Sequence, residues 1–206
     1  MKITWYGHAC FGLSGAEGSV IFDPYAPGSV PGLVLPALTA DMVLCSHYHR
    51  DHGCTEAVRL SGIEPKFKVS RFETFHDDQS GKLRGENTVS AVDMDGMRVV
   101  HMGDIGHMLS AEQLSVLGRV DVLMIPVGGF YTVDAQTAHK IVSAIKPRIV
   151  IPMHYRGKDF GYDVISTVDE FVRISENVRF FDTNELEISA VSAPMTAILK
   201  CPLDTD

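Results

Sequence analysis

The stretch Ser46-His47-Tyr48-His49-Arg50-Asp51-His52-Gly53 concentrates metal-ligating side chains in the pattern H-x-H-x-D-H. The four residues before it, Met-Val-Leu-Cys at 42–45, are apolar and typical of a buried strand, so the loop begins inside the fold. A histidine-rich surface loop is the alternative. In a buried position, however, imidazoles and a carboxylate lose hydration at a cost that a bound cation offsets. The stretch therefore predicts a metal site.

The spacing within this loop favours two metals. His47 and His49 are two residues apart, so in an extended segment they face the same way and can share one metal. Asp51 and His52 follow after the chain has turned, and they suit a second metal beside the first. A divalent metal needs about three to six donors, so further ligands must come from other parts of the chain.

Four more ionisable side chains each end an apolar, strand-like run. They are Asp23, His76, Asp104 and His154. Any one of them alone could simply mark where a strand meets water. Asp104 follows Gly103, and glycine lets a backbone approach its neighbours closely. Together with the loop at 46–53, the four positions predict one site built from several strand ends.

The first half of the chain predicts short strands, an irregular loop at Pro24–Pro36 and a hairpin that turns at Asp95-Gly96. The expected strands are Lys2–Tyr6, Ala9–Ser14, Ser19–Phe22, Met42–Cys45, Phe67–Ser70, Asn87–Val92 and Met97–Met102. No low-complexity linker and no repeat divides the sequence. We therefore expect residues 1–206 to form a single domain.

Helices and strands alternate in the second half. Ser110 with Gln113 resembles a capping box that opens a helix, and Asp134 is expected to cap a helix that reaches Ile145. Helical periodicity also covers Val164–Ser175. The expected strands are Asp121–Val127, Arg148–Met153, Val178–Phe181, Leu186–Ser189 and Met195–Lys200. Such alternation after a run of hairpins predicts an α/β protein with central sheets.

Composition limits the partners. The hydrophobic content of 45% and the charged content of 21% are ordinary for a globular protein. The net charge is −8, two bound divalent cations would offset only part of it, and no basic block is present, so a nucleic-acid partner is not expected. A small anionic substrate that meets only the metal centre remains compatible. No apolar run approaches about 18 residues, so no membrane span is expected.

The cysteine pattern favours a reducing compartment. The four cysteines show no C-x-x-C spacing, and the opening residues lack a signal-peptide pattern. We therefore expect reduced, buried or inert thiols and a cytoplasmic protein. Cys54, two residues after His52, is the alternative case of a thiol close to the metals.

The order of the predicted ligands resembles the five-motif signature of the metallo-β-lactamase superfamily, with a match over residues 3–156. The resemblance implies an αββα four-layer sandwich with the metals at one edge, between the sheets. Gly7-His8-Ala9-Cys10-Phe11 and Ile151-Pro152-Met153-His154-Tyr155 are similar to motifs of a branch of small metal-dependent hydrolases. That branch is related to ascorbate-phosphate lactonase and to the phospholipase D that cleaves N-acyl phosphatidylethanolamine. Large insertions of nuclease and lipase members are absent, so their substrates do not carry over.

The resemblance assigns three ligands to each metal and one bridging carboxylate. The first three are His47, His49 and His76, the second three are Asp51, His52 and His154, and the bridge is Asp104. Asp23 would orient a ligating imidazole. Two zinc ions are expected, although imidazole and carboxylate ligands also suit manganese and iron. Diiron redox members usually carry an acidic residue in place of His49 and an attached flavin domain. The 206 residues show neither feature, so reduction of oxygen or nitric oxide is not expected.

A metal-bound water can have a pKa of about 7, so a hydroxide would be available to attack a carbonyl carbon or a phosphorus. Asp51, Asp23 and His8 are the residues expected to take part in catalysis. His8 would contact the substrate or act as an acid, and a packed histidine is the alternative. Further candidates for substrate contact, each with a plain structural alternative, are His107, Tyr155 and Arg84. His101 is expected to be structural.

The sequence thus predicts a hydrolase that uses a dinuclear metal-bound hydroxide to cleave a small anionic ester, either a phosphodiester or a lactone. The alternative is a non-catalytic metal- or partner-binding domain of the same fold, which would have lost ligands, and none is missing. Thiol-dependent redox chemistry would need Cys54 or Cys10 near the metals. A small molecule is the expected partner, and the resemblance also allows a homo-oligomer.

Overall fold

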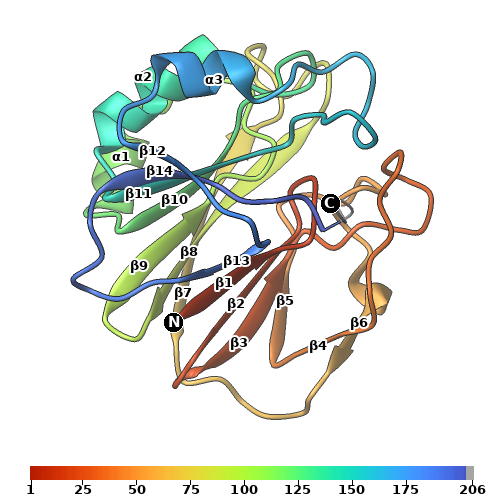
Figure 1. Cartoon of the computed structure of the whole chain (residues 1–206), viewed down its shortest axis with the longest axis vertical. Coiled ribbons are helices and arrows are strands. Elements are labelled where there is room, and N and C mark those ends of the chain that lie inside the picture. Colours follow the sequence, from red (N-terminus) through yellow and green to blue (C-terminus); the bar gives the residue numbers. More distant parts are fainter. Residues whose placement is uncertain (203–206) are drawn as a thin grey trace.

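Two β-sheets stacked face to face form the centre of the computed structural model, which describes residues 1–202 (Figure 1). The first sheet contains, in spatial order, β13 (Glu185–Glu187), β1 (Lys2–Trp5), β2 (Phe11–Gly15), β3 (Gly18–Phe22) and β5 (Met42–Leu44). The second contains β12 (Val178–Phe180), β14 (Met195–Ile198), β11 (Ile149–Met153), β10 (Val122–Pro126), β9 (Met97–His101), β8 (Glu86–Met94) and β7 (Lys68–Phe75). A separate parallel pair consists of β4 (Leu38–Ala40) and β6 (Val58–Leu60).

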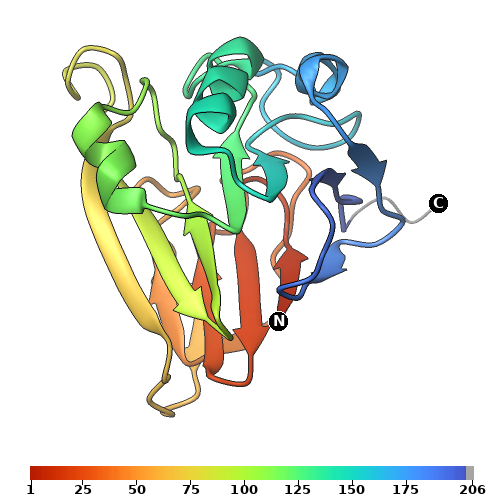
Figure 2. The ribbon, with the colours of Figure 1, turned by 90° about the vertical axis from the view of Figure 1, so that its left-hand side faces the viewer.

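The helices lie on the outer side of the second sheet (Figures 1 and 2). They are α1 (Ala111–Leu117), α2 (Ala135–Ile145) and α3 (Asp169–Ile174). A short 3₁₀ turn, Thr55–Ala57, precedes β6. The two stacked sheets agree with the αββα sandwich that the resemblance implied, and the three described α-helices cover the second sheet. Among residues 1–202, no helix is long and apolar enough to cross a membrane.

The hydrophobic core lies between the two sheets. Ile3, Trp5 and Leu13 of the first sheet are almost completely buried, as are Val99 and Leu123 of the second. Every residue of β10 and β11 is buried, and β10 pairs in parallel with both β9 and β11. Central parallel strands covered on both faces need continuous apolar runs, which explains their composition. This shared core supports the prediction of one domain, which stays a prediction.

Local signals predicted the hairpin and two helix starts correctly. The Ser110 hydroxyl accepts the Gln113 N–H, and the Gln113 side chain accepts the Ser110 N–H, so the capping box is confirmed. The Asp134 carboxylate accepts the Thr137 N–H, and α2 ends at Ile145 as expected. Strands β8 and β9 pair as the predicted hairpin.

Two predicted elements were wrong in length. The helix expected over Val164–Ser175 begins only at Asp169, because the Ser166 N–H donates to the Gly128 carbonyl and its own carbonyl accepts from Arg156. Strand β7 extends to Phe75 rather than ending at Ser70, because it pairs with β8 along its whole length. The C-terminal strands also divide between the sheets, since β13 pairs with β1 and β14 inserts between β11 and β12.

Candidate metal centre

The predicted ligands meet where the strands of both sheets end. The 46–53 loop follows β5, His76 follows β7 directly, and His154 follows β11. Asp104, three residues after β9, lies among them. Its Oδ2 atom is 3.1 Å from His76 Nε2, 3.1 Å from His154 Nε2 and 3.2 Å from His52 Nε2. A single carboxylate therefore reaches ligands that come from three different segments.

The donor atoms fall into three overlapping clusters, within each of which the atoms lie no more than 4.8 Å apart. The clusters are His47 with His49 and His76, His47 with His52 and Asp104, and His8 with Asp51, His52 and His154. The first and third match the two groups of three that the resemblance implied, with His8 added to the third. The remaining cluster places Asp104 between them.

Several of these donors are buried and have no hydrogen-bond partner. The atoms are His47 Nε2, His52 Nε2, Asp104 Oδ1, His154 Nδ1 and both ring nitrogens of His8. Buried polar atoms without partners are costly and rare in folded proteins. Imidazole nitrogens and carboxylate oxygens are also the donors that zinc, manganese and iron prefer. The residues present therefore fit divalent metal ions.

Hydrogen bonds on the far side of the rings fix which nitrogen faces the centre. His52 Nδ1 donates to Asp23 Oδ2 at 2.8 Å, and His76 Nδ1 donates to the Tyr131 carbonyl at 3.0 Å. His47 Nδ1 is 3.0 Å from the Ser46 hydroxyl, which itself donates to Asp23 at 2.6 Å. Each bond at Nδ1 leaves the Nε2 lone pair for a metal.

Strained backbone conformations place three of these side chains. His8, Asp23 and His154 have φ of 52°, 44° and 53°, in the left-handed region that few residues other than glycine adopt. Such conformations cluster at functional sites, where the surrounding structure holds them. Gly103 has φ of 56°, and a Cβ there would overlap Asn87 and Ser46. Its close approach positions the Asp104 N–H, which donates to Asn87 Oδ1 at 2.8 Å.

The charges of the centre suit metal binding. Burial alone would raise the pKa of Asp104, but His154 and His52 hold it well below its usual range. Burial opposes the charging of His52, yet Asp104 and Asp23 raise its pKa well above the usual value. Burial, assisted by the neighbouring His52, lowers the pKa of His47 to about 3. Metals bind ionised carboxylates and neutral imidazoles, so binding would displace the proton from His52.

A cavity of about 420 Å³ opens over the centre. It is lined by His49, Asp51, His76, Leu83, Arg84, Asp104, Tyr131, His154 and Tyr162. The Arg84 guanidinium lies 5.8 Å from the centroid of the Tyr131 ring. The Tyr162 hydroxyl donates to the Ser29 carbonyl at 2.6 Å and lies 3.1 Å from Asp51 Oδ2. The cavity thus combines aromatic and cationic groups with the ligands.

Sequence reasoning missed three residues of this site: Ser46, Tyr131 and Tyr162. Ser46 directly precedes His47, so a hydroxyl beside the ligand motif was a usable signal. Tyr131 contributes a backbone carbonyl and Tyr162 comes from an irregular loop. Neither belongs to a periodic pattern. The loop Phe130–Asp134 was expected to border the site, but nothing in the sequence singled out Tyr131 within it, and nothing pointed to Tyr162.

Other candidates lie away from the cavity lining. His107 is bonded to backbone at both nitrogens, since Nε2 accepts the Phe75 N–H and Nδ1 donates to the Met108 carbonyl. The buried Tyr155 ring packs against Trp5 and Phe160. All four cysteines are buried, and in the described part of the chain none joins a cluster of metal-ligating atoms.

Comparison with known proteins agrees with this geometry. Residues 2–154 match the family model of the beta-lactamase superfamily domain. A UPF0173 metal-dependent hydrolase of Thermoplasma acidophilum is 31% identical over 193 residues, which cover 77% of this chain and 85% of the relative. A second, from Archaeoglobus fulgidus, is 32% identical over 194 residues, which cover 75% and 83%.

Solved structures show the same fold. A protein of the metallo-beta-lactamase superfamily from Thermotoga maritima superposes with a TM-score of 0.76 at 31% identity and covers 96% of this chain and 97% of its own. The metallo hydrolase Igni18 from Ignicoccus hospitalis gives a TM-score of 0.61 at 20% identity, with 84% and 88% covered. The narrower relation to ascorbate-phosphate lactonase and the phospholipase D stays a prediction. The chain belongs to the metallo-β-lactamase superfamily, among the metal-dependent hydrolases.

Proposed function

We propose that this protein is a dinuclear metal hydrolase that cleaves a small anionic ester, a phosphodiester or a lactone. The observation that carries the proposal is the position of Asp104, whose carboxylate lies within 3.2 Å of three imidazoles from separate segments. When bound, two divalent metals lower the pKa of water to about 7 and stabilise negative charge on the attacked group. Zinc is the proposed metal, because the donors are imidazoles and carboxylates.

The ligand assignment is part of the proposal. His47, His49 and His76 would hold the first metal, Asp51, His52 and His154 would hold the second, and Asp104 would contribute to both. Asp23 acts on catalysis through His52, because its carboxylate fixes the ring so that Nε2 faces the centre. Asp51 is partly exposed, with 19% of its side chain accessible, and borders the cavity, so it can meet both a metal and substrate-side water.

The lining of the cavity supports an anionic substrate. Arg84 is the cation at its rim, and Tyr131 holds the guanidinium over the opening. A guanidinium pairs with phosphate or carboxylate through two parallel hydrogen bonds. The volume of about 420 Å³ suits a small molecule. Leu83 supplies an apolar contact beside the charge.

The structure gives little support to the expected role of His8 as an acid, whereas it does group His8 with the donors of the second metal. The ring is completely buried and does not line the cavity, so it has no path to a substrate oxygen. Tyr162 does line the cavity, and its hydroxyl lies beside Asp51. We propose Tyr162 as the residue that contacts the substrate from this side.

Hydrolysis of bis(p-nitrophenyl) phosphate and of a lactone panel tests the proposal, with and without a chelator. The wild-type protein should bind two metal equivalents and hydrolyse one class of ester. His47→Ala and Asp104→Asn should abolish turnover, whereas His139→Gln, on helix α2, should not. Two bound metals with no turnover on any ester would favour the alternative, a non-catalytic metal-binding domain.

Two further predictions accompany the function. A cytoplasmic location is supported by four buried cysteines and by the absence of a disulfide among the described residues. Self-association stays a prediction, which size-exclusion chromatography with light scattering would test.

A further inference from the structure

His8 occupies the tight turn between β1 and β2 and is completely buried. Neither of its ring nitrogens has a hydrogen-bond partner. An imidazole loses hydration when it is buried, and a protein normally restores the lost hydrogen bonds. The folded chain alone therefore leaves both ring nitrogens of His8 without the hydrogen bonds that burial requires.

The neighbours of the ring are donors of the proposed second metal. His8 Nε2 lies 3.4 Å from Asp51 Oδ2. The ring centroid is 4.0 Å from that of His154 and 5.1 Å from that of His52. One donor atom from each of these four residues lies within 4.8 Å of the other three. That spacing is what a shared cation would require.

The backbone holds the ring in this position. The His8 carbonyl accepts the indole N–H of Trp5 at 3.0 Å and the His154 N–H at 3.2 Å. The Cys10 N–H closes the turn by donating to the Gly7 carbonyl at 2.9 Å. Because His8 and His154 are bonded through their main chains, their imidazoles enter the centre as a pair. The positive φ of both residues is part of the same arrangement.

His101 shows how a structural histidine differs. It is equally buried, but its Nε2–H donates to the Ala9 carbonyl at 2.8 Å and its Nδ1 accepts the Gly103 N–H at 3.1 Å. Both nitrogens are satisfied by the backbone of adjacent loops. If His8 only filled space, the same kind of partner would be expected for it.

We propose that His8 is an additional ligand of the second metal. The proposal rests on the dinuclear centre proposed above and extends it. The second metal then has five protein donors, namely His8, Asp51, His52, His154 and Asp104. The first has four, namely His47, His49, His76 and Asp104.

Unequal donor numbers give the two positions different metal preferences. Four donors suit a tetrahedral zinc ion. Five donors and one water make a six-coordinate position, which admits manganese or iron as well as zinc. The centre is therefore asymmetric, with a zinc-like first position and a second position that accepts octahedral ions. In this role His8 is not available as a proton donor.

Cobalt(II) titration of the metal-free protein tests the assignment, because four-coordinate cobalt absorbs visible light much more strongly than six-coordinate cobalt. The wild type should show one strongly and one weakly absorbing equivalent. His8→Gln keeps a polar side chain beside Asp51 but removes the imidazole. It should weaken the second equivalent by more than about tenfold, since even residues that only orient ligands cost about 10–100-fold. The absorption of that equivalent should also rise as a donor is lost. The matched control, His101→Gln, removes a buried imidazole and should leave both equivalents unchanged.

An unchanged second equivalent in His8→Gln would overturn the assignment while leaving the seven-ligand centre intact. A wild-type protein that binds fewer than two equivalents would overturn the dinuclear proposal and this one with it. His8→Asn, in which asparagine tolerates positive φ, replaces the first variant if glutamine prevents folding. A crystal structure of the metal-loaded wild type decides independently of any variant. A His8 nitrogen should lie about 2.0–2.3 Å from the second metal, and a distance above about 3 Å would refute the ligand role.

Discussion

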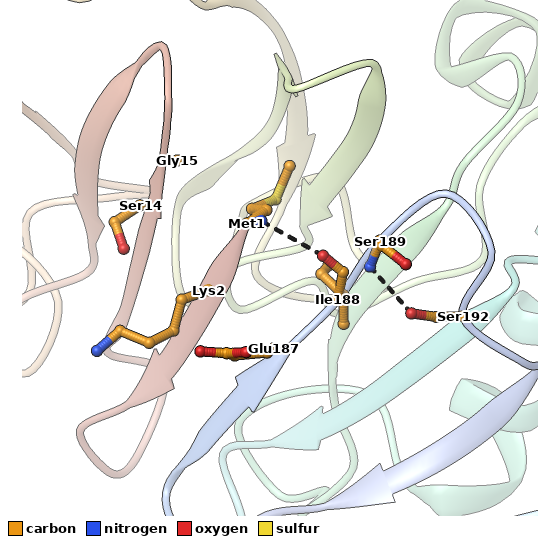
Figure 3. Close-up of a pocket in the computed structure, with 8 residues that line it drawn as sticks. All are labelled: Met1, Lys2, Ser14, Gly15, Glu187, Ile188, Ser189 and Ser192. Atoms are coloured by element: carbon orange, nitrogen blue, oxygen red, sulfur yellow. Dashed lines mark hydrogen bonds between the residues drawn. The ribbon is translucent and has the colours of Figure 1, made fainter.

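The two ends of β1 lie beside two very different cavities. Beyond its C-terminal end lie His8 and the metal centre, with a cavity of about 420 Å³. At its N-terminal end a larger cavity, of about 560 Å³, opens beside Met1 and Lys2 (Figure 3). The remaining lining of the second cavity is Ser14, Gly15, Glu187, Ile188, Ser189 and Ser192.

The difference lies in the state of the polar groups. Around the larger cavity several of them are paired: the Met1 amino group donates to the Ile188 carbonyl, and the Ser189 N–H donates to Ser192 (Figure 3). Lys2 pairs with Glu185 at 2.8 Å. At the metal centre, buried nitrogens and a carboxylate oxygen have no partner. Apart from Arg148 Nε, the buried side-chain atoms without a partner among the described residues gather at the candidate metal centre, so they point to that end of β1 and cavity volume does not.

The sharpest test of this contrast is Asp104→Asn. The neutral amide of asparagine binds a metal far less well than a carboxylate does. It also carries no negative charge to offset the repulsion between two neighbouring cations. The variant should retain about one metal equivalent instead of two, and its kcat should fall by more than about 100-fold, beyond the usual effect of residues that only orient ligands. Elemental analysis of the dialysed protein measures the stoichiometry. Two equivalents in the variant would contradict the bridging role.

Asp23→Asn should have the next largest effect. The carboxylate accepts hydrogen bonds from the Ser46 N–H, the Ser46 hydroxyl and His52 Nδ1. Without it, His52 loses the bond that orients its ring, and Ser46, which contacts His47 Nδ1, loses its charged acceptor, so metal affinity should fall about 10–100-fold. Competition with a fluorescent chelator measures the affinity. Asp95→Asn, in the distant hairpin turn, is the control and should bind metal like the wild type.

Arg84→Gln should separate anionic from neutral substrates. Loss of the guanidinium removes a charge-assisted contact, so KM for an anionic ester should rise roughly tenfold while kcat changes little. A neutral lactone should show no change. Lys82→Gln removes a cation from an exposed position on the same loop and serves as the control. Equal KM values for Arg84→Gln and wild type on the anionic ester would exclude Arg84 from recognition.

Asp77→Asn should produce a pH-dependent loss of stability. Burial opposes ionisation of Asp77, but the N–H groups of Arg84, Gln79, Leu83 and Gly81 donate to its carboxylate and lower its pKa. A lowered folded-state pKa stabilises the protein above the unfolded value, and that contribution disappears as pH falls through the folded value. The Tm of the variant should thus lie below that of wild type at pH 7.

This difference should shrink as the pH is lowered from about 4 towards 2, as thermal melts across that range would show. Asp78→Asn, at the exposed neighbouring position, should match wild type throughout. A difference for Asp77→Asn that is constant with pH would mean that the carboxylate charge does not hold the loop.

The smallest effect is expected at the other end of β1. Glu187→Gln and Ser14→Ala line the larger cavity but remove no buried, unpaired group. Each should change the free energy of unfolding by less than about 0.5 kcal/mol and leave esterase activity unchanged. A loss of activity in either variant would show that the larger cavity takes part in function.

Local chemistry explains how much could be predicted from the sequence. Features that depend only on residues close in the sequence could be predicted. These are the helix caps at Ser110 and Asp134 and the turn at Asp95-Gly96. The seven proposed ligands could be named from the sequence because the 46–53 loop, His76, Asp104 and His154 each follow a strand-like run and the resemblance supplied the pattern, and their ligand roles stay a prediction. The distances from Asp104 to the three imidazoles came only from the fold.

Features that depend on distant backbone were not readable. The start of α3 depends on the bond between Ser166 and Gly128, and the length of β7 depends on its pairing with β8. Nothing in the three residues of β13 indicates that this strand pairs with β1 in the first sheet. Tyr162 reaches Asp51 from 111 positions away. These contacts form only when the chain is already folded.

Tyr131 performs two tasks with two separable parts of one residue. Its carbonyl oxygen fixes the His76 ring, and its aromatic ring lies beneath the Arg84 guanidinium. Every amino acid carries the carbonyl, whereas the ring belongs to tyrosine. A substitution at this position can therefore change the substrates that the cavity accepts while the hydrogen bond that orients His76 is kept. A change of the side chain at position 131 would alter the cavity beside Arg84 and leave the orientation of His76 unchanged.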